Sequence, residues 1–526
     1  MRTLRLVLIV VSVVAGAAAG TVPSKVRPPA VAGTFYPADP KELAKMVDDF
    51  LARAAPPPVD NLVALVAPHA GYVYSGQVAA YSYALLKGRK ADRVVVIAPS
   101  HYQRFDFSSV YDGTAYATPL GQVPVDRAFA AKLAKMSPLI RLSDVGHSAT
   151  GERGEHALEV QLPFLQRVLG EFQVVPIVMG DQGYEASRAL AVALAKLIQG
   201  SNTLIVASSD LSHYYPYQEA VTRDRKLLTA VEEWDYFNLS QNLERDVWEA
   251  CGGGPIVAAM MASERLGASQ ARLLKYANTG DVTGDRSRVV GYSAVALVKS
   301  PPPGNSRQPA FSLSRQERDT LIEIARKSVE TAVRDRKVYE CAVPKAEALV
   351  QERGAFVTLT KNGELRGCIG YVAPMKPLYL AVRDVAMMAA VRDTRFAPVN
   401  AKELPDLEYE ISVLSPLRRV LDPQEIKIGQ HGLLIRNGDR EGILLPQVAA
   451  DEHWDRLTFL EEVCVKAGLP RHAWQNPDSD LFRFTALIFG ARLPVETLTP
   501  EELFRMPVAG LTPPAPGSPA LTAPPF

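Results

Sequence analysis

The chain contains few cysteines, almost no net charge and no long apolar run beyond its first residues. Four cysteines among 526 residues are too few for the disulfide framework of a small secreted scaffold. Lys and Arg number 58 and Asp and Glu 57, so the overall charge offers no basic surface for nucleic acid. No stretch after the N-terminus reaches the roughly 20 apolar residues of a transmembrane helix, and no repeat of fixed period is visible.

The composition is that of a soluble globular protein. Hydrophobic residues make up 47% of the chain and charged residues 22%, which excludes a wholly disordered or fibrous protein. At roughly 150 residues per domain, the length predicts two to four domains.

The first 20 residues have the pattern of a secretory signal peptide. Arg2 and Arg5 provide a short positive region, Leu6–Val14 is nearly all aliphatic, and Ala15–Gly20 consists of small residues. We expect cleavage after Ala19, so that the protein is exported, periplasmic or extracellular, and the mature chain is not stably inserted in a membrane. The alternative is an uncleaved N-terminal segment that anchors the chain.

Two proline-rich segments divide the rest of the chain. Residues 300–312 begin with SPPPGNSRQPA, a composition typical of an interdomain linker. Residues 507–526 contain seven prolines and no charged side chain, and we expect this tail to be disordered. The chain is therefore predicted to have a first domain over residues 25–299 and a second domain over residues 313–506.

Buried strands and helices alternate in the first domain. Four near-continuous apolar runs are typical of strands that are covered on both faces. They are Leu62–Ala67, Arg93–Ala98, Val174–Val178 and Thr203–Ala207. Helices are expected between them, at Pro40–Ala55, His156–Leu169 and Tyr184–Gln199. This alternation predicts an α/β fold with a mainly parallel central sheet.

The second domain has the pattern of an α+β fold built on an antiparallel sheet. Asn362-Gly363 joins the runs Ala355–Thr360 and Leu365–Val372, and this dipeptide supplies the positive φ angles of a type I′ hairpin turn. Further strand-like runs are Leu407–Leu414 and Leu433–Leu445, and helices are expected at Gln316–Lys337, Pro377–Val391 and Trp454–Ala467.

Polar side chains follow three of the four apolar runs of the first domain. His69 and His101 lie just after the first and second runs, and Asp210 and His213 follow the fourth. Ligands of parallel α/β sheets bind beyond the carboxyl ends of the strands, so these strand ends predict one shared site. The alternative for each residue is a loop side chain bonded to backbone. His156 is expected to have either a structural or a site role.

Cys251 adds a sulfur to these strand-end side chains. It precedes a helix expected over Pro255–Leu266, and a helix N-terminus favours the thiolate form of a nearby cysteine. Two imidazoles and one thiolate can hold iron, copper or zinc, with positions left open for substrate or oxygen. His213, oriented by Asp210, is the natural proton carrier of such a site. The alternative is a small cysteine buried in the core.

Six segments, spread in order over nearly all of residues 25–299, carry a family resemblance. They are VAGTFYP at 31–37, PHAGY at 68–72, PSH at 99–101, EHALE at 155–159, SDLSH at 209–213 and NTGD at 278–281. Together they resemble the Memo family, which includes the protein called AmmeMemoRadiSam system protein B. The resemblance implies an α/β fold similar to that of the class III non-haem iron extradiol dioxygenases.

The Memo resemblance also implies a metal site. Carried over residue by residue, it places the metal at His69, His101 and Cys251, with Asp210 and His213 at catalytic-type positions beside it. Iron(II) is the first expectation for the metal and copper the second. A carboxylate completes the iron site of the dioxygenases, so the thiol of Cys251 departs from their pattern and follows that of Memo.

A second resemblance begins directly after the Asn-Gly turn, with LRGCIG at 365–370. Supporting segments are DTRF at 393–396, ISVLSP at 411–416, GQHGL at 429–433, LLPQ at 444–447 and KAGL at 466–469. Together they resemble the AMMECR-type domain, called AmmeMemoRadiSam system protein A, over most of residues 313–500. The third member of this system by name is a radical SAM protein, which the resemblance therefore implies as a partner.

The LRGCIG motif permits two interpretations. Period-2 alternation places Arg366, Cys368 and Gly370 on one face of the strand. A guanidinium beside a thiol favours the thiolate, and Gly367 and Gly370 allow another backbone or a ligand to approach closely. In the alternative, a tight hairpin packs a small buried cysteine and Arg366 forms a structural ion pair. If the chain is exported, Cys341 could also pair with Cys368 or Cys464.

Two functions from different classes fit these features. The first is a metal-dependent, dioxygenase-like oxidoreductase that acts on an unknown small molecule. The second is a metal-binding interaction or maturation factor without turnover of its own. The presence of both domains in one polypeptide favours a shared process in either case.

Overall fold

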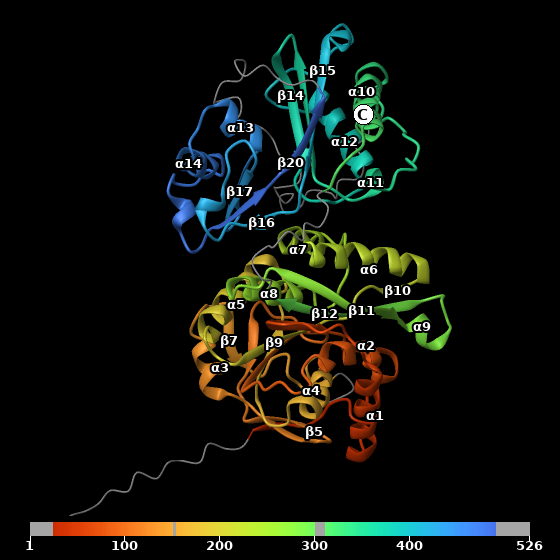
Figure 1. Ribbon diagram of the computed structural model, residues 1–526, viewed down its shortest axis with the longest axis vertical. Coiled ribbons are helices and arrows are strands. Elements are labelled where there is room, and N and C mark those ends of the chain that lie inside the picture. The colour runs from red at the N-terminus through yellow and green to blue at the C-terminus, as the bar shows by residue number, and fades with distance from the viewer. Residues whose placement is uncertain (1–24, 151–153, 300–310, 491–526) are drawn as a thin grey trace, which may run out of the picture.

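The computed structural model describes residues 25–150, 154–299 and 311–490. The predicted signal peptide, most of the predicted linker and the predicted tail lie outside these ranges. The described residues form two domains stacked along the long axis of the molecule, with the N-terminal domain at the bottom of Figure 1 and the C-terminal domain at the top. Within the described ranges, no helix is long and apolar enough to cross a membrane.

A nine-stranded mixed sheet forms the centre of the N-terminal domain. Its order is β10-β12-β2-β9-β3-β8-β4-β7, and β11 also pairs with β12. The four central strands, β2, β9, β3 and β8, run parallel. The strand bounds are β2 Leu62–Ala67, β3 Arg93–Pro99, β4 Ser108–Tyr111, β7 Ile140–Ser143, β8 Gln173–Met179, β9 Thr203–Ser208, β10 His213–Tyr215, β11 Gln270–Asn278 and β12 Val289–Val298.

Helices cover both faces of this sheet. Val94 and Val96 of β3 belong to the apolar core on the side of α1, α2 and α4, and Val95 and Ile97 belong to the core on the side of α5 to α8. Alternate side chains of a strand point to opposite faces, so a strand covered on both faces is apolar throughout. The helix bounds are α1 Pro40–Arg53, α2 Tyr72–Ala84, α4 Leu162–Leu169, α5 Tyr184–Ile198, α6 Tyr217–Glu232, α7 Tyr236–Glu244 and α8 Gly253–Arg265.

The four predicted strands of the parallel core are confirmed, and one predicted helix begins later than expected. The predicted helix over His156–Leu169 is wrong in its first turn. A 3-10 turn over Glu159–Gln161 precedes the helix proper, α4, which starts at Leu162. Pro163 occupies the first turn of α4, the position of a helix that tolerates proline best because its N–H has no intrahelical partner. His156 is therefore a loop residue.

The C-terminal domain contains two antiparallel sheets, as an α+β fold with antiparallel pairing requires. The first has the order β14-β13-β15-β20 and packs against α10 and α12; the second has the order β16-β19-β17-β18 and contacts α13 and α14. The bounds are β13 Ala355–Lys361, β14 Glu364–Tyr371, β15 Leu407–Leu414, β16 Arg418–Arg419, β17 Gly432–Asn437, β18 Arg440–Leu444, β19 Asp480–Phe484, β20 Ala486–Gly490, α10 Arg315–Asp335, α11 Glu347–Val350, α12 Leu378–Val391, α13 Pro446–Asp451 and α14 Arg456–Lys466.

Two hairpins of this domain test the predictions from sequence. Asn362 and Gly363 have φ angles of 52° and 81°, so the turn predicted from this dipeptide has the expected positive φ values. The predicted single run Leu433–Leu445 is wrong, because it contains the hairpin of β17 and β18. Gly438 lies in the turn between these strands and has a φ of 57°. A glycine between two apolar runs is a turn signal, and the prediction of a single run did not take it into account.

The two domains share one apolar core. The ring of Phe482 in β19 lies 5.0 Å from that of Phe237 and 6.1 Å from that of Tyr236, both in α7. Beside these rings the buried carboxylate of Asp480 accepts hydrogen bonds from Tyr184 and Arg188 of the N-terminal domain. Buried aromatic contacts and a buried charge cluster together fix the relative position of the domains.

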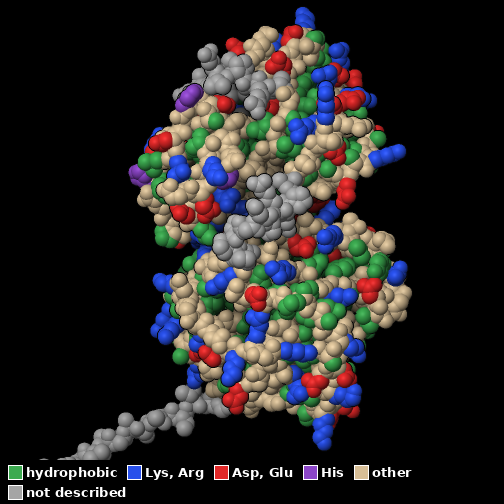
Figure 2. Space-filling view, viewed as in Figure 1, with side chains coloured by type: hydrophobic (Ala, Val, Ile, Leu, Met, Phe, Trp, Pro, Cys, Tyr) green, Lys and Arg blue, Asp and Glu red, His purple; other side chains and the backbone are tan. Residues whose placement is uncertain are grey.

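Charged side chains of both signs are interspersed over both domains on the face shown in Figure 2. This distribution agrees with the nearly balanced count of acidic and basic residues. The visible face therefore has no extended region of one charge.

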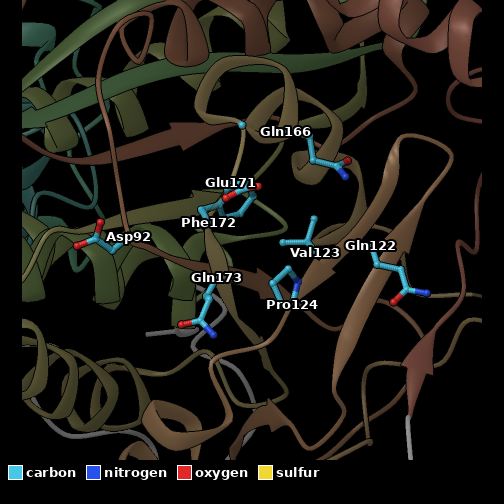
Figure 3. Close-up of a pocket in the computed structure, with 9 residues that line it drawn as sticks. Asp92, Gln122, Val123, Pro124, Gln166, Glu171, Phe172 and Gln173 are labelled. Carbon is cyan, nitrogen blue, oxygen red and sulfur yellow. The ribbon is translucent and has the colours of Figure 1, made fainter.

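A hollow of about 570 Å³ opens at the amino ends of β3 and β8 (Figure 3). Its polar lining consists of Asp92, Gln122, Gln166, Glu171 and Gln173. No histidine or cysteine is among its lining residues. Sites in parallel α/β sheets lie at the carboxyl ends of the strands, so this hollow is at the edge opposite to the one where a functional site is expected.

Candidate metal centre

The carboxyl ends of β2, β3 and β9 bring three kinds of ligand to one place. His69 follows β2, His101 follows β3, and Cys251 lies in the loop before α8, against the end of β9. One ligand atom from each of these three residues lies within 4.8 Å of the other two. The structure thus brings together all three residues that the sequence suggested as metal ligands.

His69 is buried and held from two sides. Its Nε2 lies 3.0 Å from the Sγ of Cys251, and its Nδ1 lies 2.9 Å from the Oγ of Ser208. Its backbone N–H donates to Asp210 Oδ1 at 2.7 Å. Burial lowers the pKa of this imidazole well below its ordinary value, so the ring is neutral at physiological pH. A neutral imidazole is the form that binds a metal.

Glu155 fixes the orientation of His101. The Nδ1 of His101 lies 3.0 Å from Glu155 Oε1, and the backbone N–H of His101 donates to Glu155 Oε2 at 2.7 Å. Burial alone would raise the pKa of this carboxyl, but the hydrogen bonds and charge of His101 outweigh it and lower the pKa to about 2. An ionised Glu155 keeps the proton on Nδ1, which leaves Nε2 for a metal.

Cys251 approaches the strand ends because the next residue is glycine. A Cβ on Gly252 would lie 2.1 Å from the carbonyl oxygen of Ser208, so a larger residue would push the loop away. The Sγ of Cys251 accepts the N–H of Asp210 at 3.2 Å. Burial raises the pKa of this thiol, and the charge of Asp210 raises it further. The expected bias toward thiolate is therefore absent in the metal-free protein, and a bound cation would have to supply it.

Asp210 and His213 lie at the same edge but are not hydrogen-bonded to each other. Their ligand atoms and the Sγ of Cys251 lie within 4.8 Å of one another. The carboxylate beside His213 is that of Glu249, whose Oε1 lies 3.6 Å from Nδ1 and accepts the backbone N–H of His213 at 3.1 Å. Burial raises the pKa of Asp210 to about 6. Both carboxylates therefore lie near the ring of His213, and Glu249 is in addition bonded to its backbone.

His156 also belongs to this cluster. Its ring stacks on that of His101 at 4.6 Å and 17°, and it lies edge-on to His69 at 5.6 Å. Its Nδ1 is buried without a hydrogen-bond partner, and burial lowers its pKa to about 3. A neutral, unpartnered nitrogen in a cluster of imidazoles fits a site that accepts a metal ion.

Comparison with known proteins identifies the family. Residues 27–296 match the family described as Memo-like protein, which is slightly more than half of the chain. The chain belongs to the Memo family. A MEMO1 family protein of Aeropyrum pernix is 41% identical over 286 residues, covering 52% of this chain and 100% of that protein. One of Methanopyrus kandleri is 38% identical over 283 residues, covering 52% of this chain and 98% of that protein.

The C-terminal part of this Memo family protein matches a second family. Residues 322–489 match the family described as AMMECR1. Among solved structures, an uncharacterized protein of Pyrococcus horikoshii is 38% identical, with a TM-score of 0.32, and covers 33% of this chain and 91% of its own length. By the two family matches alone, the protein is a fusion of a Memo domain, residues 27–296, with an AMMECR1 domain, residues 322–489.

The LRGCIG motif of this Memo family protein is packed tightly in the AMMECR1 domain. A bulge in the pairing of β13 with β14 interrupts the expected alternation at Arg366. The guanidinium of Arg366 instead donates to Glu403 at 2.9 and 3.1 Å. Gly367 permits close packing of α12, because a Cβ there would lie 2.1 Å from the carbonyl oxygen of Ala389.

Cys368 is fully buried between β13 and the 393–395 turn. Its Sγ lies 3.2 Å from the Oγ1 of Thr358, and its backbone N–H donates to Asp393 at 2.8 Å. Burial raises the pKa of this thiol to about 11. Gly370 lies opposite Phe356 in the sheet register. Together these contacts favour the structural interpretation of the motif. All four cysteines of the chain are free thiols in this structure.

Replacing Glu155 by glutamine is expected to weaken metal binding to this Memo domain about 10–100-fold, as is typical when a carboxylate behind a metal-binding histidine is lost. The neutral amide no longer holds the proton on His101 Nδ1, so the ring can turn away from the centre. Calorimetric titration of the metal-free protein with Co²⁺ measures the change. Glu42→Gln, an exposed site on α1, serves as the control, and equal affinities of both variants would contradict this role.

Proposed function

We propose that the Memo domain binds a transition metal through His69, His101 and Cys251 and acts as a dioxygenase-like oxidoreductase on a small molecule. Iron(II) is the first candidate for the metal and copper the second. The convergence of three ligand atoms within 4.8 Å of one another carries the proposal. Two nitrogen donors and one sulfur donor suit iron, copper or zinc rather than magnesium or calcium, which prefer oxygen ligands.

The residues around the centre have distinct roles under this proposal. When bound, the metal supplies the electron-transfer chemistry. Glu155 holds His101 in place, and Asp210 holds the backbone of His69. His213 carries protons, because its imidazole is partly exposed, it is not one of the three proposed metal ligands, and Glu249 lies beside its Nδ1. Its Nε2 then exchanges the proton with a substrate.

A hollow beside Glu155, the carboxylate that contacts His101, suits a small polar substrate. Its volume is about 200 Å³, and it is lined by Ser100, Tyr102, Gln103, Gly146, Ser148 and Glu155. Hydroxyl and amide groups of this lining can donate to oxygen atoms of a ligand. A volume of this size excludes a large cofactor but admits a compact ring or chain.

The proposal is tested by metal analysis and oxygen uptake of the full chain. Protein purified without oxygen is expected to retain about one transition-metal ion per chain, and His101→Ala is expected to lose it. Oxygen consumption is then followed with catechol-like compounds or cell extract added. His472→Ala is the matched control, because His472 is exposed in the C-terminal domain.

The outcomes separate the two candidate functions. Metal lost in His101→Ala, together with oxygen uptake by the unaltered protein, supports the oxidoreductase. Metal bound without any uptake supports the alternative, a metal-binding interaction or maturation factor, which the buried position of His69 also permits. The absence of a stoichiometric transition metal from the unaltered protein would remove both.

A further inference from the structure

The segment that carries Cys251 lies against the AMMECR1 domain. This segment, residues 245–252, connects α7 with α8. The indole N–H of Trp248 donates to the carboxylate of Glu352 in the AMMECR1 domain at 3.3 Å. Arg245 contacts the sulfur of Met375 in the same domain at 3.0 Å. Trp248 is also buried in the apolar core that the two domains share.

Glu352 is held in place by one contact within the AMMECR1 domain and by a second contact with the Memo domain. Its backbone forms a bridge with Pro377 at the start of α12. Its second carboxylate oxygen forms an ion pair with Lys226 of α6, and the carboxylate is mostly buried. A carboxylate fixed in this way is a firm support for the indole, since hydrogen bonds to a charged acceptor are stronger than those between neutral groups.

Within its own domain the segment is bonded at its start, through Val247 and Trp248 to the carbonyl of Asn242, in its middle, through Glu249 to the N–H of His213, and at its end. The amide of Gln182 donates to the carbonyl of Cys251 at 2.9 Å, and its oxygen accepts the N–H of Gly254 at 3.0 Å. Gly252 donates to the Oγ of Ser209 at 3.1 Å. These bonds hold the start of α8 against the ends of β8 and β9.

The middle of the segment spans a hollow. A space of about 270 Å³ lies beneath it, lined mainly by Leu243, Glu244, Asp246, Trp248, Glu249 and Gln182. Asp246 has a φ of 55°, a left-handed conformation that is common at the residue that follows the end of a helix. The N–H groups of Val247 and Trp248 both donate to the carbonyl oxygen of Asn242 and impose this conformation at the end of α7. The contacts of Trp248 and Arg245 with the AMMECR1 domain therefore act on the side chains of the segment, beyond this turn.

We propose that the AMMECR1 domain positions the thiol of the metal centre, with Glu352 acting through Trp248 on the segment that carries Cys251 and Glu249. This inference rests on the proposed function insofar as Cys251 is a metal ligand. Glu352 and Trp248 are positioning residues, and neither touches the centre itself. The same segment places Glu249 beside His213, so the AMMECR1 domain governs both the thiol and the partner of the proton carrier.

The test uses the full chain with Glu352→Ala, Glu352→Gln and Trp248→Phe. Two quantities are measured for each: the rate at which iodoacetamide alkylates Cys251 in metal-free protein, mapped by mass spectrometry, and the dissociation constant of Co²⁺, followed by the sulfur-to-cobalt charge-transfer band. Glu352→Ala is expected to speed alkylation several-fold and to weaken Co²⁺ binding about 10-fold, the lower end of what losing an outer partner costs. Trp248→Phe is expected to act in the same direction.

Two variants distinguish positioning from general loosening of the interface. Glu352→Gln keeps an acceptor for the indole and is expected to restore both values close to those of the unaltered protein. Lys226→Gln removes the ion pair to Glu352 but leaves the Trp248 bond, and is expected to do the same. Changes in Lys226→Gln as large as those in Glu352→Ala would overturn the role of Trp248.

The two proposals fail separately. Faster alkylation in Glu352→Ala, with no Co²⁺ binding by any form of the protein, would support the positioning of Cys251 and refute the metal function. Unchanged alkylation and unchanged Co²⁺ binding in both Glu352→Ala and Trp248→Phe would overturn the positioning while leaving the metal function intact. Should Glu352→Ala unfold, as circular dichroism would reveal, Trp248→Phe decides the question by the same two measurements.

Discussion

Replacing Asp480 by alanine is expected to destabilise the folded chain by about 3–5 kcal/mol, the usual cost of removing one partner from a buried ion cluster. The Asp480 carboxylate is 2% exposed. Arg188 donates to it at 2.8 Å, Arg419 at 3.2 Å and Arg265 at 3.4 Å. Without this carboxylate, three guanidinium groups at the domain interface lose a common partner and remain partly buried. The destabilisation is measured by urea denaturation with both domains in the full chain.

Asp478→Ala is the control for this measurement, because Asp478 is exposed two residues before Asp480. It is expected to leave the denaturation midpoint unchanged, since exposed substitutions away from special contacts have small effects. A midpoint for Asp480→Ala equal to that of the control would show that the cluster does not stabilise the interface.

The stabilisation by Asp480 is also expected to depend on pH. Burial alone would raise the pKa of this carboxyl, but the charges of Arg188, Arg265 and Arg419 outweigh it, so that the pKa lies below its ordinary value. The contribution is therefore fully present above the unfolded-state pKa of about 3.9 and is lost as the pH falls toward the folded-state pKa. The difference between the unaltered protein and Asp480→Ala should shrink below about pH 4.

Replacing Glu159 by alanine is expected to cost a similar amount, about 3–5 kcal/mol, because it leaves Arg27 buried without its partner. The side chains of Glu159 and Arg27 are 0% and 3% exposed. Glu159 also accepts the N–H groups of Ala30 at 2.7 Å and Val31 at 3.1 Å, as well as the hydroxyl of Tyr36. One carboxylate thus holds the whole segment 27–36 against the domain. Urea denaturation again measures the loss.

The Glu159 variant is also expected to disturb the candidate metal centre, because Phe35 of the same segment lies 4.6 Å from the ring of His156. Glu171→Ala, at an exposed position of the same domain, provides the comparison and should match the unaltered protein. If Glu159→Ala were as stable as Glu171→Ala, the segment would have to be held by its apolar contacts alone.

The strands of the parallel sheet could be predicted because burial on both faces leaves a signal in every residue. β2, β3, β8 and β9 each extend no more than one residue beyond an end of the predicted run. The Asn362-Gly363 hairpin could also be predicted, since few dipeptides tolerate two positive φ angles. The hairpin of β17 and β18 was not predicted, because both of its strands are apolar and its short turn interrupts the apolar pattern only briefly.

The site residues that follow buried strands could be predicted from the sequence, whereas the carboxylates beside them could not. His69 and His101 follow buried strands, so topology alone places them at one edge. Glu155 and Glu249 come from loops whose paths follow from packing rather than from local sequence, and their roles beside His101 and His213 were not foreseen. A carboxylate adjacent to a histidine, as in Glu155-His156, was the one available signal. Burial likewise raises the pKa of the Cys251 thiol, which is opposite to the effect that the helix N-terminus alone predicts.

The shared contact of Phe482 with Tyr236 and Phe237 restricts how the two halves of this protein can diverge. A larger or smaller ring on one side needs a matching change on the other, because closely packed interiors tolerate neither voids nor overlap. In an AMMECR1 domain transplanted from another protein, the side chain at the position of Phe482 would not be matched in size to Tyr236 and Phe237. Substitutions on either side of this interface are therefore expected to occur in compensating pairs.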